Sequence, residues 1–286
     1  MRGIGLFAAA AVMFLVSGCV KHSVVVQVKS DGSGVVHIRH FEEETRFGKE
    51  NEIKAPTRDE LRKLASKMGD GVSLRSVEMK RDANGWHGFE ILFDFKDVNK
   101  LILNEQGLAS LLQVNRKGGE EKARESTTPK SGVDNGPFTG AALREIKLRH
   151  SDGVLTIEPN FSAPKSARTE SETVDPFAGT AGAGSFPNKM ALAMASPFIG
   201  AARFGFFVEV EPGIRQSNAR FVRGKQIAIV NVNFGKLLSQ KNGEQNLSLL
   251  DDLTAVSGQP EKAQKVCDQI SGLEVDMTRK ITVRTR

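Results

Sequence analysis

The residues Ser23-Val-Val-Val-Gln-Val-Lys29 and Val35-Val-His-Ile-Arg-His-Phe41 decide the fold class, and Asp31-Gly-Ser-Gly34 joins them. Apolar and polar side chains alternate in both stretches, and the glycines are typical of a turn, so the pattern predicts a β-hairpin. A three-residue loop over 32–34 would pair Val28 with Ile38 and place both apolar sets on one face. A two-residue loop would instead turn His37 and Arg39 toward the valines. Register follows the buried face, and we therefore predict the three-residue loop.

A capped helix follows this hairpin. Thr57 and Glu60 have the spacing of a capping box, in which each side chain binds the other residue's backbone N–H. The apolar residues after them form one helical stripe: Leu61, Leu64, Ala65 and Met68. Gly69 and Gly71 are predicted to end the helix.

A second hairpin is predicted over residues 72–80 and 86–95, around Asp82-Ala-Asn-Gly85. Its second strand places large apolar side chains on one face: Phe89, Ile91, Phe93 and Phe95. Residues 97–112 fit either a short helix or an extended edge, and their periodicity does not decide between the two.

The second half of the chain has a similar alternation. We predict a hairpin over 143–149 and 154–158, a helix over 190–196 capped by Asn188, and a strand over 204–210 that returns after Pro212-Gly213 as 214–222. A strand over 226–232, a helix over 260–270 and a strand over 273–284 complete the list. Hairpin–helix–hairpin thus occurs at 23–96 and 143–232, as a diverged repeat or as ordinary α+β layering.

Length and composition set the class of protein. The chain has 286 residues, of which 39% are apolar and 26% charged, with a formal charge of +6 and two cysteines. These values exclude disordered, collagen-like and polytopic membrane proteins, and the cysteine count excludes a disulfide framework or a Cys-rich zinc module. We predict an α+β fold of mostly antiparallel sheets with helices packed on one face.

Shifts in composition indicate the domain boundaries. Residues 113–140 lose apolar content and are predicted to form a polar linker or loop between an N-terminal α+β unit over 19–112 and a C-terminal unit over 141–286. Residues 159–187 are rich in small and polar residues and are predicted to be a mobile loop within the second unit.

The first nineteen residues indicate export. Arg2 supplies a positive end, residues 4–16 are uncharged and apolar, and Val16-Ser17-Gly18-Cys19 follows. The apolar run is shorter than the roughly 20 residues that span a bilayer as a helix, which is typical of a signal peptide. The alternative is an ordinary secretory signal with a chance cysteine.

The motif Val16-Ser17-Gly18-Cys19 resembles the lipobox of bacterial lipoproteins. The resemblance implies that residues 1–18 are a signal peptide, that cleavage occurs before Cys19, and that Cys19 carries a diacylglyceryl thioether and an acyl group such as palmitate. Val20 is not the aspartate that retains enteric lipoproteins in the inner membrane. The resemblance therefore implies an anchor in the outer membrane, facing the periplasm, where the source has two membranes. The mature region is similar only to uncharacterised envelope lipoproteins.

Residues capable of catalysis or metal binding show no recognised spacing. His37 and His40 point to opposite faces of a strand, and His22, His87 and His150 form no ligand pair, so surface histidines are the prediction. Cys267 is predicted to be a buried packing thiol. The glycines of 179–189 lack a phosphate-loop ending, and no nucleophile elbow occurs. We predict no cofactor, no metal and no enzymatic activity.

A group of cations gathers around the predicted strands of the second half: Arg203, Arg215, Arg220, Arg223 and Lys225. Such a group could favour anionic partners in the envelope, although a solvated strand face is the simpler explanation. Nucleic acid is not an expected partner for an exported chain without a nucleic-acid motif.

Three functions are compatible with the sequence. A membrane-anchored, non-enzymatic interaction or scaffold protein, binding an envelope protein or an anionic envelope polymer, is the first prediction. A carrier of a lipid or small apolar ligand on the Phe-rich faces is the alternative. An enzyme with an unrecognised site is the second alternative.

Overall fold

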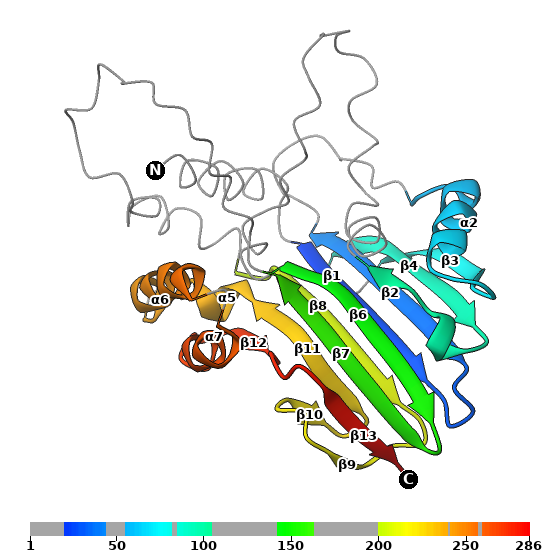
Figure 1. The fold of residues 1–286 in the computed structure, drawn as a ribbon. Helices are drawn as coiled ribbons and strands as arrows, with labels where there is room; N and C mark the ends of the chain where they lie inside the picture. Colours follow the sequence, from blue (N-terminus) through cyan, green and yellow to red (C-terminus); the bar gives the residue numbers. More distant parts are fainter. Residues whose placement is uncertain are drawn as a thin grey trace, which may run out of the picture.

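A computed structural model describes residues 20–43, 55–81, 85–104, 142–162, 200–239, 241–256 and 259–286. Two sheets pack against each other, and helices flank them at two places (Figure 1). The predicted α+β class with mostly antiparallel sheets is confirmed. The predicted linker 113–140 and helix 190–196 lie outside the described residues, as does the predicted loop 159–187 beyond residue 162. The first four residues of that predicted loop belong to a strand, so its predicted start was wrong.

Sheet A has eight strands in the order β10-β11-β8-β1-β2-β4-β3, and β12 also pairs with β11. Their bounds are β1 (Val20–Val28), β2 (Gly34–Glu43), β3 (Ser73–Arg81), β4 (Trp86–Phe95), β8 (Arg203–Val210), β10 (Val222–Arg223), β11 (Gln226–Asn233) and β12 (Leu273–Val275). Strands from both halves of the chain meet where β8 lies parallel to β1, so the two predicted units share one sheet.

Sheet B has five strands in the order β5-β6-β7-β13-β9. Their bounds are β5 (Leu103–Asn104), β6 (Ala142–Ser151), β7 (Val154–Ser162), β9 (Ile214–Ser217) and β13 (Ile281–Thr285). The short 3-10 helix η1 (Val98–Lys100) precedes β5. Residues 97–104, which the periodicity left undecided, therefore hold both a helical turn and a short edge strand.

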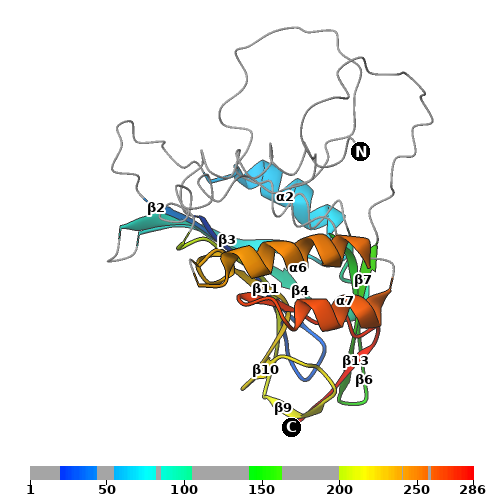
Figure 2. The same ribbon diagram turned by 90° about the vertical axis from the view of Figure 1, so that its left-hand side faces the viewer.

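The helices lie in two places. The first, α2 (Arg58–Lys67), packs beside β3, and the others, α5 (Phe234–Leu237), α6 (Gly243–Ala255) and α7 (Pro260–Cys267), gather at the opposite side of the molecule (Figures 1 and 2). The pattern gave no prediction for α5 or α6, and α7 ends three residues earlier than predicted.

The β1–β2 hairpin has the predicted buried face but a different register. Val28 pairs with Gly34 rather than with Ile38, and Ile38 pairs with Val24. The turn closes earlier than predicted because Lys29 N donates to Ser33 O at 2.8 Å and Gly32 takes a left-handed φ of 81°. The prediction of a three-residue loop was therefore wrong. The pairing register differs from the predicted one by four residues, and because this number is even, every side chain stays on its predicted face.

Gly34 belongs to the sheet and not to the turn. A Cβ at this position would lie 1.9 Å from Gln27 O and 2.5 Å from Phe95 Cζ. Only glycine fits where neighbouring backbone and an aromatic ring approach so closely. A sequence pattern assigns such a glycine to the turn because nothing in its local neighbours reports the contact.

Two predicted strands of the second half were wrong. The chain after Gly213 does not return beside β8, because β9 crosses to sheet B and pairs with β13, while β11 takes the place beside β8. β11 buries Ile227, Ala228 and Ile229, whereas β9 buries none of its residues, so burial favours β11 at the centre. The predicted strand 273–284 is divided between β12 in sheet A and β13 in sheet B.

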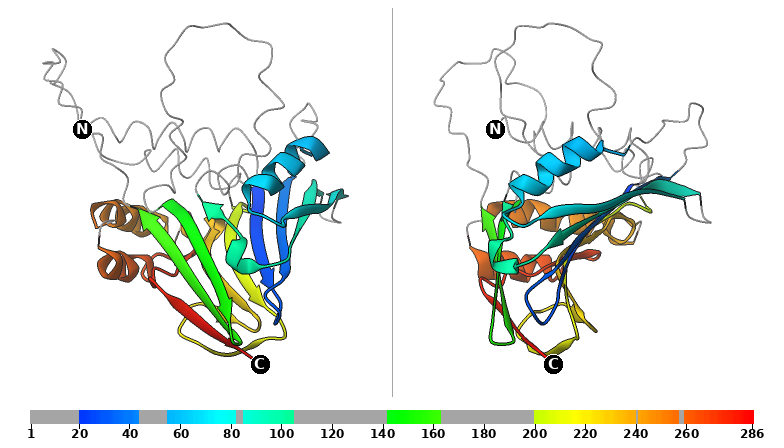
Figure 3. Two further views of the ribbon diagram at one scale, coloured as in Figure 1. Left: turned by 45° about the vertical axis from the view of Figure 1, so that its right-hand side comes forward. Right: turned by 90° about the vertical axis from the view of Figure 1, so that its right-hand side faces the viewer.

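One hydrophobic core joins sheet A, sheet B and α2 (Figure 3). It contains the alternating residues of β1 and β2, the predicted stripe of α2 and the phenylalanine face of β4. The intervening residues of β1, such as Val25 and Gln27, are only partly buried, so the second face of sheet A is more open. A smaller cluster, which includes Val232 and Cys267, packs α5, α6 and α7 against the end of β11.

The predicted capping box at α2 is confirmed and gives a first testable prediction. Thr57 Oγ1 accepts from Glu60 N at 3.3 Å, and Glu60 Oε2 accepts from Thr57 N at 2.9 Å. We expect Thr57→Ala to lower the free energy of unfolding by about 1 kcal/mol because the backbone N–H of Glu60 loses its side-chain acceptor. Urea unfolding measures the loss, and Thr57→Ser is the control that keeps most of the stability. Equal losses in both variants would contradict the role of the cap.

Candidate functional site

The two ends of sheet A have different surroundings. We call the end at which β1 and β8 begin the proximal end, near Val20 and Arg203, and the end at which they finish the distal end, near Val28 and Val210. Val20 is the first described residue, so β1 begins directly after Cys19. The chain terminus Arg286 lies at the distal end (Figure 1).

A buried histidine pair lies at the proximal end, on the core face of sheet A. His22 of β1 pairs across the strands with His40 of β2, and each is 8% exposed. His22 stacks on Phe204 at 6.0 Å between ring centroids, and His40 stacks on Phe89 at 5.2 Å. The prediction of surface histidines was wrong for these two residues, because they continue the apolar alternation of their strands.

The contacts of the histidine pair indicate which ring nitrogens carry a proton. His22 Nδ1 lies 3.3 Å from His40 Nδ1, and His40 Nε2 lies 3.1 Å from Glu42 Oε1. A carboxylate only accepts, so His40 Nε2 carries the proton in that contact. When both rings are neutral, His40 Nδ1 accepts from His22 Nδ1–H and leaves a lone pair on His22 Nε2. Among the described residues, no polar atom partners His22 Nε2.

Burial sets the protonation of His22. Burial, with a smaller contribution from the neighbouring His40, lowers the pKa of this imidazole to about 3. His37, on the other face of β2, has its pKa lowered by burial and by Arg39, while Glu90 acts in the opposite direction. His22 is therefore neutral at ordinary pH and packs as a core residue.

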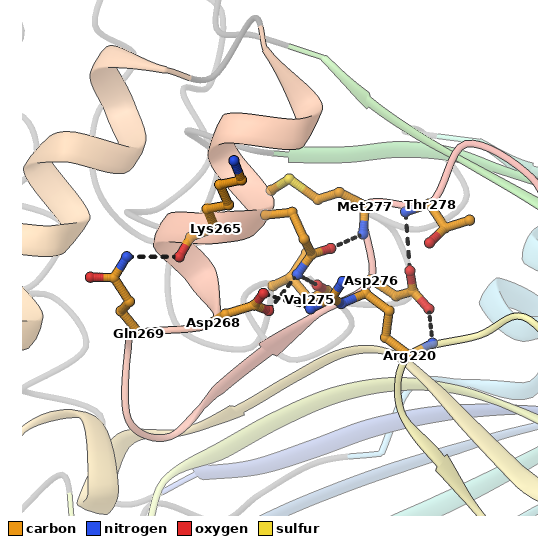
Figure 4. Close-up of polar contacts among 9 residues, drawn as sticks. Arg220, Lys265, Asp268, Gln269, Val275, Asp276, Met277 and Thr278 are labelled. Atoms are coloured by element: carbon orange, nitrogen blue, oxygen red, sulfur yellow. Dashed lines mark hydrogen bonds and ion pairs between the residues drawn. The ribbon is translucent and has the colours of Figure 1, made fainter.

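A polar network holds the crossing from β12 to β13 (Figure 4). The fully buried Asp276 accepts from Arg220 N at 2.8 Å through one oxygen and from Thr278 N at 3.0 Å through the other. Gln264 of α7 donates to Val275 O and accepts from Met277 N, both at 2.9 Å. Because these buried polar groups are paired with backbone groups, the network fixes the path of the chain between the two sheets.

Two of the five predicted cations belong to this region and are neutralised. Arg220 forms an ion pair with Asp268 of the tail at 2.5 Å, and Arg223 forms one with Glu274 of β12. Arg203 lies at the proximal end, a strand length away from Arg215 and Lys225. The structure therefore does not bring the five residues together on one surface.

Arg215 and Lys225 instead join cations of the last strand at the distal end. Arg215 and Arg284 line an open hollow of about 350 Å³ together with Asp152, Gly153, Val154 and Thr285. A methyl group added at Gly213 would contact Arg286 Cδ at 3.7 Å and Lys225 Cγ at 4.0 Å, so these two side chains flank one turn. We call Arg215, Lys225, Arg284 and Arg286 the distal cation cluster; Arg284 and Arg286 were absent from the sequence-based group.

The structure tests the prediction for Cys267 but not the one for Cys19. Cys267 is 1% exposed, and burial together with the neighbouring Asp268 raises the pKa of its thiol to about 12. The predicted packing thiol is confirmed. Cys19 lies outside the described residues, so its lipid attachment stays a prediction.

Metal-ligand groups and membrane-spanning helices are two features that concern only the described ranges. Within them, no three histidine, cysteine or acidic side chains gather closely enough to hold a metal ion. No helix in these ranges has both the length and the apolar character needed to cross a membrane.

Comparisons with known proteins add one structural likeness. No family model and no curated protein matches the chain. Among solved structures, the folded domain of the LppM protein of Mycobacterium tuberculosis aligns with a TM-score of 0.35 and 10% sequence identity, over 77% of this chain and 85% of that one.

Proposed function

We propose that this chain is a lipid-anchored protein of the bacterial envelope, and that it acts by binding an envelope component without catalysing a reaction. The observation that carries the proposal is the position of the lipobox relative to the fold. β1 begins at Val20, one residue after Cys19, and is a central strand of sheet A. A lipid on Cys19 would therefore tether the folded body without an intervening linker.

A lipid at this position would also set the orientation of the folded protein relative to the membrane. β1 has nine residues and is about 30 Å long at the usual rise of a strand. A lipid on Cys19 holds the proximal end at the bilayer surface and directs the distal end away from it. Two or three acyl chains supply durable attachment, because each buried methylene contributes about 0.8 kcal/mol. In an organism with two membranes, the predicted site is the outer membrane, facing the periplasm.

The character of the reactive groups favours binding over catalysis. His22 is neutral and enclosed in the core, and the thiol of Cys267 is buried with a raised pKa, which opposes nucleophilic attack. The carrier alternative requires an interior space lined by phenylalanines. The phenylalanines of β4 and Phe206 of β8 instead pack into the core formed with sheet B and α2, and Phe204 packs against the smaller cluster.

The proposal predicts the behaviour of the two cysteines in membrane extracts. We expect the full chain, expressed in a lipoprotein-processing bacterium, to enter the detergent phase on phase separation, and Cys19→Ala to move to the aqueous phase because it lacks the lipid. Cys267→Ala is the matched control, since it removes the only other cysteine and leaves the anchor intact. Detergent partitioning of Cys19→Ala equal to that of the unmodified sequence would contradict the anchor.

A further inference from the structure

We infer that the distal cation cluster is a binding site for a polyanionic glycan of the envelope, a sugar chain that carries repeated carboxylate or phosphate groups. The inference rests on the proposed function for its orientation and names the ligand class that the binding protein would hold. Its residues come from β9, from the turn between β10 and β11, and from β13 and the residue that follows it.

Strand pairing assembles this cluster at one place. Arg284 of β13 pairs with Gln216 of β9 on one side and with Val154 of β7 on the other. The register then shifts, so that Thr285 faces Ile214 and Arg215 has no partner in the ladder. A bulge of this kind redirects a side chain from the regular alternation, and Arg215 lines the hollow together with Arg284.

The second half of the cluster surrounds the neighbouring turn. Arg286 N donates to Gly213 O at 3.1 Å, and Lys225 O accepts from Val210 N at 2.9 Å. These backbone bonds hold the two side chains on either side of Gly213, which has a φ of 151°. The cluster is thus built on hydrogen-bonded backbone and not on one isolated loop.

The charges of the cluster are uncompensated by direct ion pairs. Among the described residues, no carboxylate side chain lies within ion-pair distance of its four cations, whereas Arg220 and Arg223, which are also exposed, are both paired. The acidic side chains nearby include Asp152, which lines the hollow, and Glu209 and Glu211, whose carboxylates accept from Gln27 Nε2 at 3.4 and 2.9 Å. Arginine presents a planar fork of donors that matches carboxylate and phosphate groups.

The shape and lining of the hollow favour one class of anionic ligand. It is open, and Val154 is its one large apolar lining residue, so it lacks the apolar anchor typical of a protein interface. A membrane lipid of the anchoring bilayer is unsuitable, because the cluster lies at the distal end, about 30 Å from the start of β1. A chain of charged sugars is the ligand that matches an open, polar and positively charged surface.

The experiment measures binding by the full chain purified in nonionic detergent. The probes are polygalacturonate for the carboxylate source, polyglycerol phosphate for the phosphate source, and poly-glutamate as an acidic peptide, with neutral dextran as the blank. We expect at least one anionic glycan polymer to bind, more weakly as salt rises. We expect Arg215→Gln with Arg284→Gln to weaken that binding roughly tenfold or more, because two unpaired donors are lost.

The matched control is Arg220→Gln with Arg223→Gln, which removes the same charge from paired arginines. We expect it to change the affinity less than about twofold, since the carboxylates already occupy these side chains. Absence of binding to both glycan polymers, equal losses in the two double variants, or equal binding of poly-glutamate would each overturn the inference. Unchanged Trp86 fluorescence verifies that the variants are folded. Because the assay needs no membrane, its failure is distinguishable from failure of the Cys19 anchor.

Discussion

Replacing Phe206 by alanine is expected to lower the free energy of unfolding by about 3–5 kcal/mol, the usual cost of removing a buried phenylalanine. Phe206 is 2% exposed and lies in β8, where it pairs with Val24 of β1 and with Val230 of β11. Its ring belongs to the core that joins both sheets. The cavity left by alanine lies at the contact between strands from the two halves of the chain, and both halves lose packing.

The single tryptophan reports this effect from the other half. Trp86 lies in β4 and is 5% exposed, so its fluorescence follows unfolding of the N-terminal strands. If the shared sheet makes the fold cooperative, Phe206→Ala shifts the urea midpoint seen by Trp86 as much as the midpoint seen by circular dichroism. Phe207→Ala, on the more open face of the same strand, is the control, and we expect less than half of the loss. An unchanged Trp86 midpoint in Phe206→Ala would contradict the shared sheet.

Acid is expected to destabilise the fold through His22. The pKa of His22 is about 3 in the folded chain, below the ordinary value of 6.5. Above the ordinary value both states are neutral, and His22 adds no pH dependence. Between 6.5 and 3 the unfolded chain binds a proton that the folded chain excludes, so stability falls as pH falls, by about 1.4 kcal/mol per pH unit. From about pH 7.5 to about pH 4.5, His22 is expected to cost about 2–3 kcal/mol.

The variant His22→Phe isolates this contribution. It keeps an aromatic ring beside Phe204 and removes the titrating group, so we expect its stability to fall by about 2–3 kcal/mol less than that of the unmodified chain over the same pH range. Urea titrations at several pH values measure both slopes. Phe204→Leu is the control that disturbs the same stack but keeps His22 and its pH dependence. Parallel pH profiles for His22→Phe and the unmodified chain would contradict the assignment.

Local alternation predicted most of the strands and their buried faces, but not the neighbours of each strand. The face of β1 follows from the spacing of Val24 and Val26, because side chains alternate with period two. The parallel pairing of β1 with β8 joins Val26 to Val208, which are remote in the sequence. No local pattern encodes such a pairing, since burial in the assembled core selects it.

Local sequence also fails to predict the partners of the charged and polar side chains. Arg220 and Arg223 formed part of a predicted cationic surface, yet their acidic partners follow 48 and 51 residues later. The buried Asp276 lies in a short connection without periodicity, so nothing nearby predicts its burial. The histidine pair had a usable signal, because His22 continues the even-numbered valines of β1 and His40 continues the even-numbered apolar residues of β2.

The most direct test of the central claim is the mass of the N-terminal peptide of the protein extracted from bacterial membranes. We predict a peptide that begins at Cys19, lacks residues 1–18 and carries the added mass of a diacylglyceryl group, with or without an acylated amine. A peptide that begins before Cys19, or one that begins at Cys19 without added lipid mass, would contradict it.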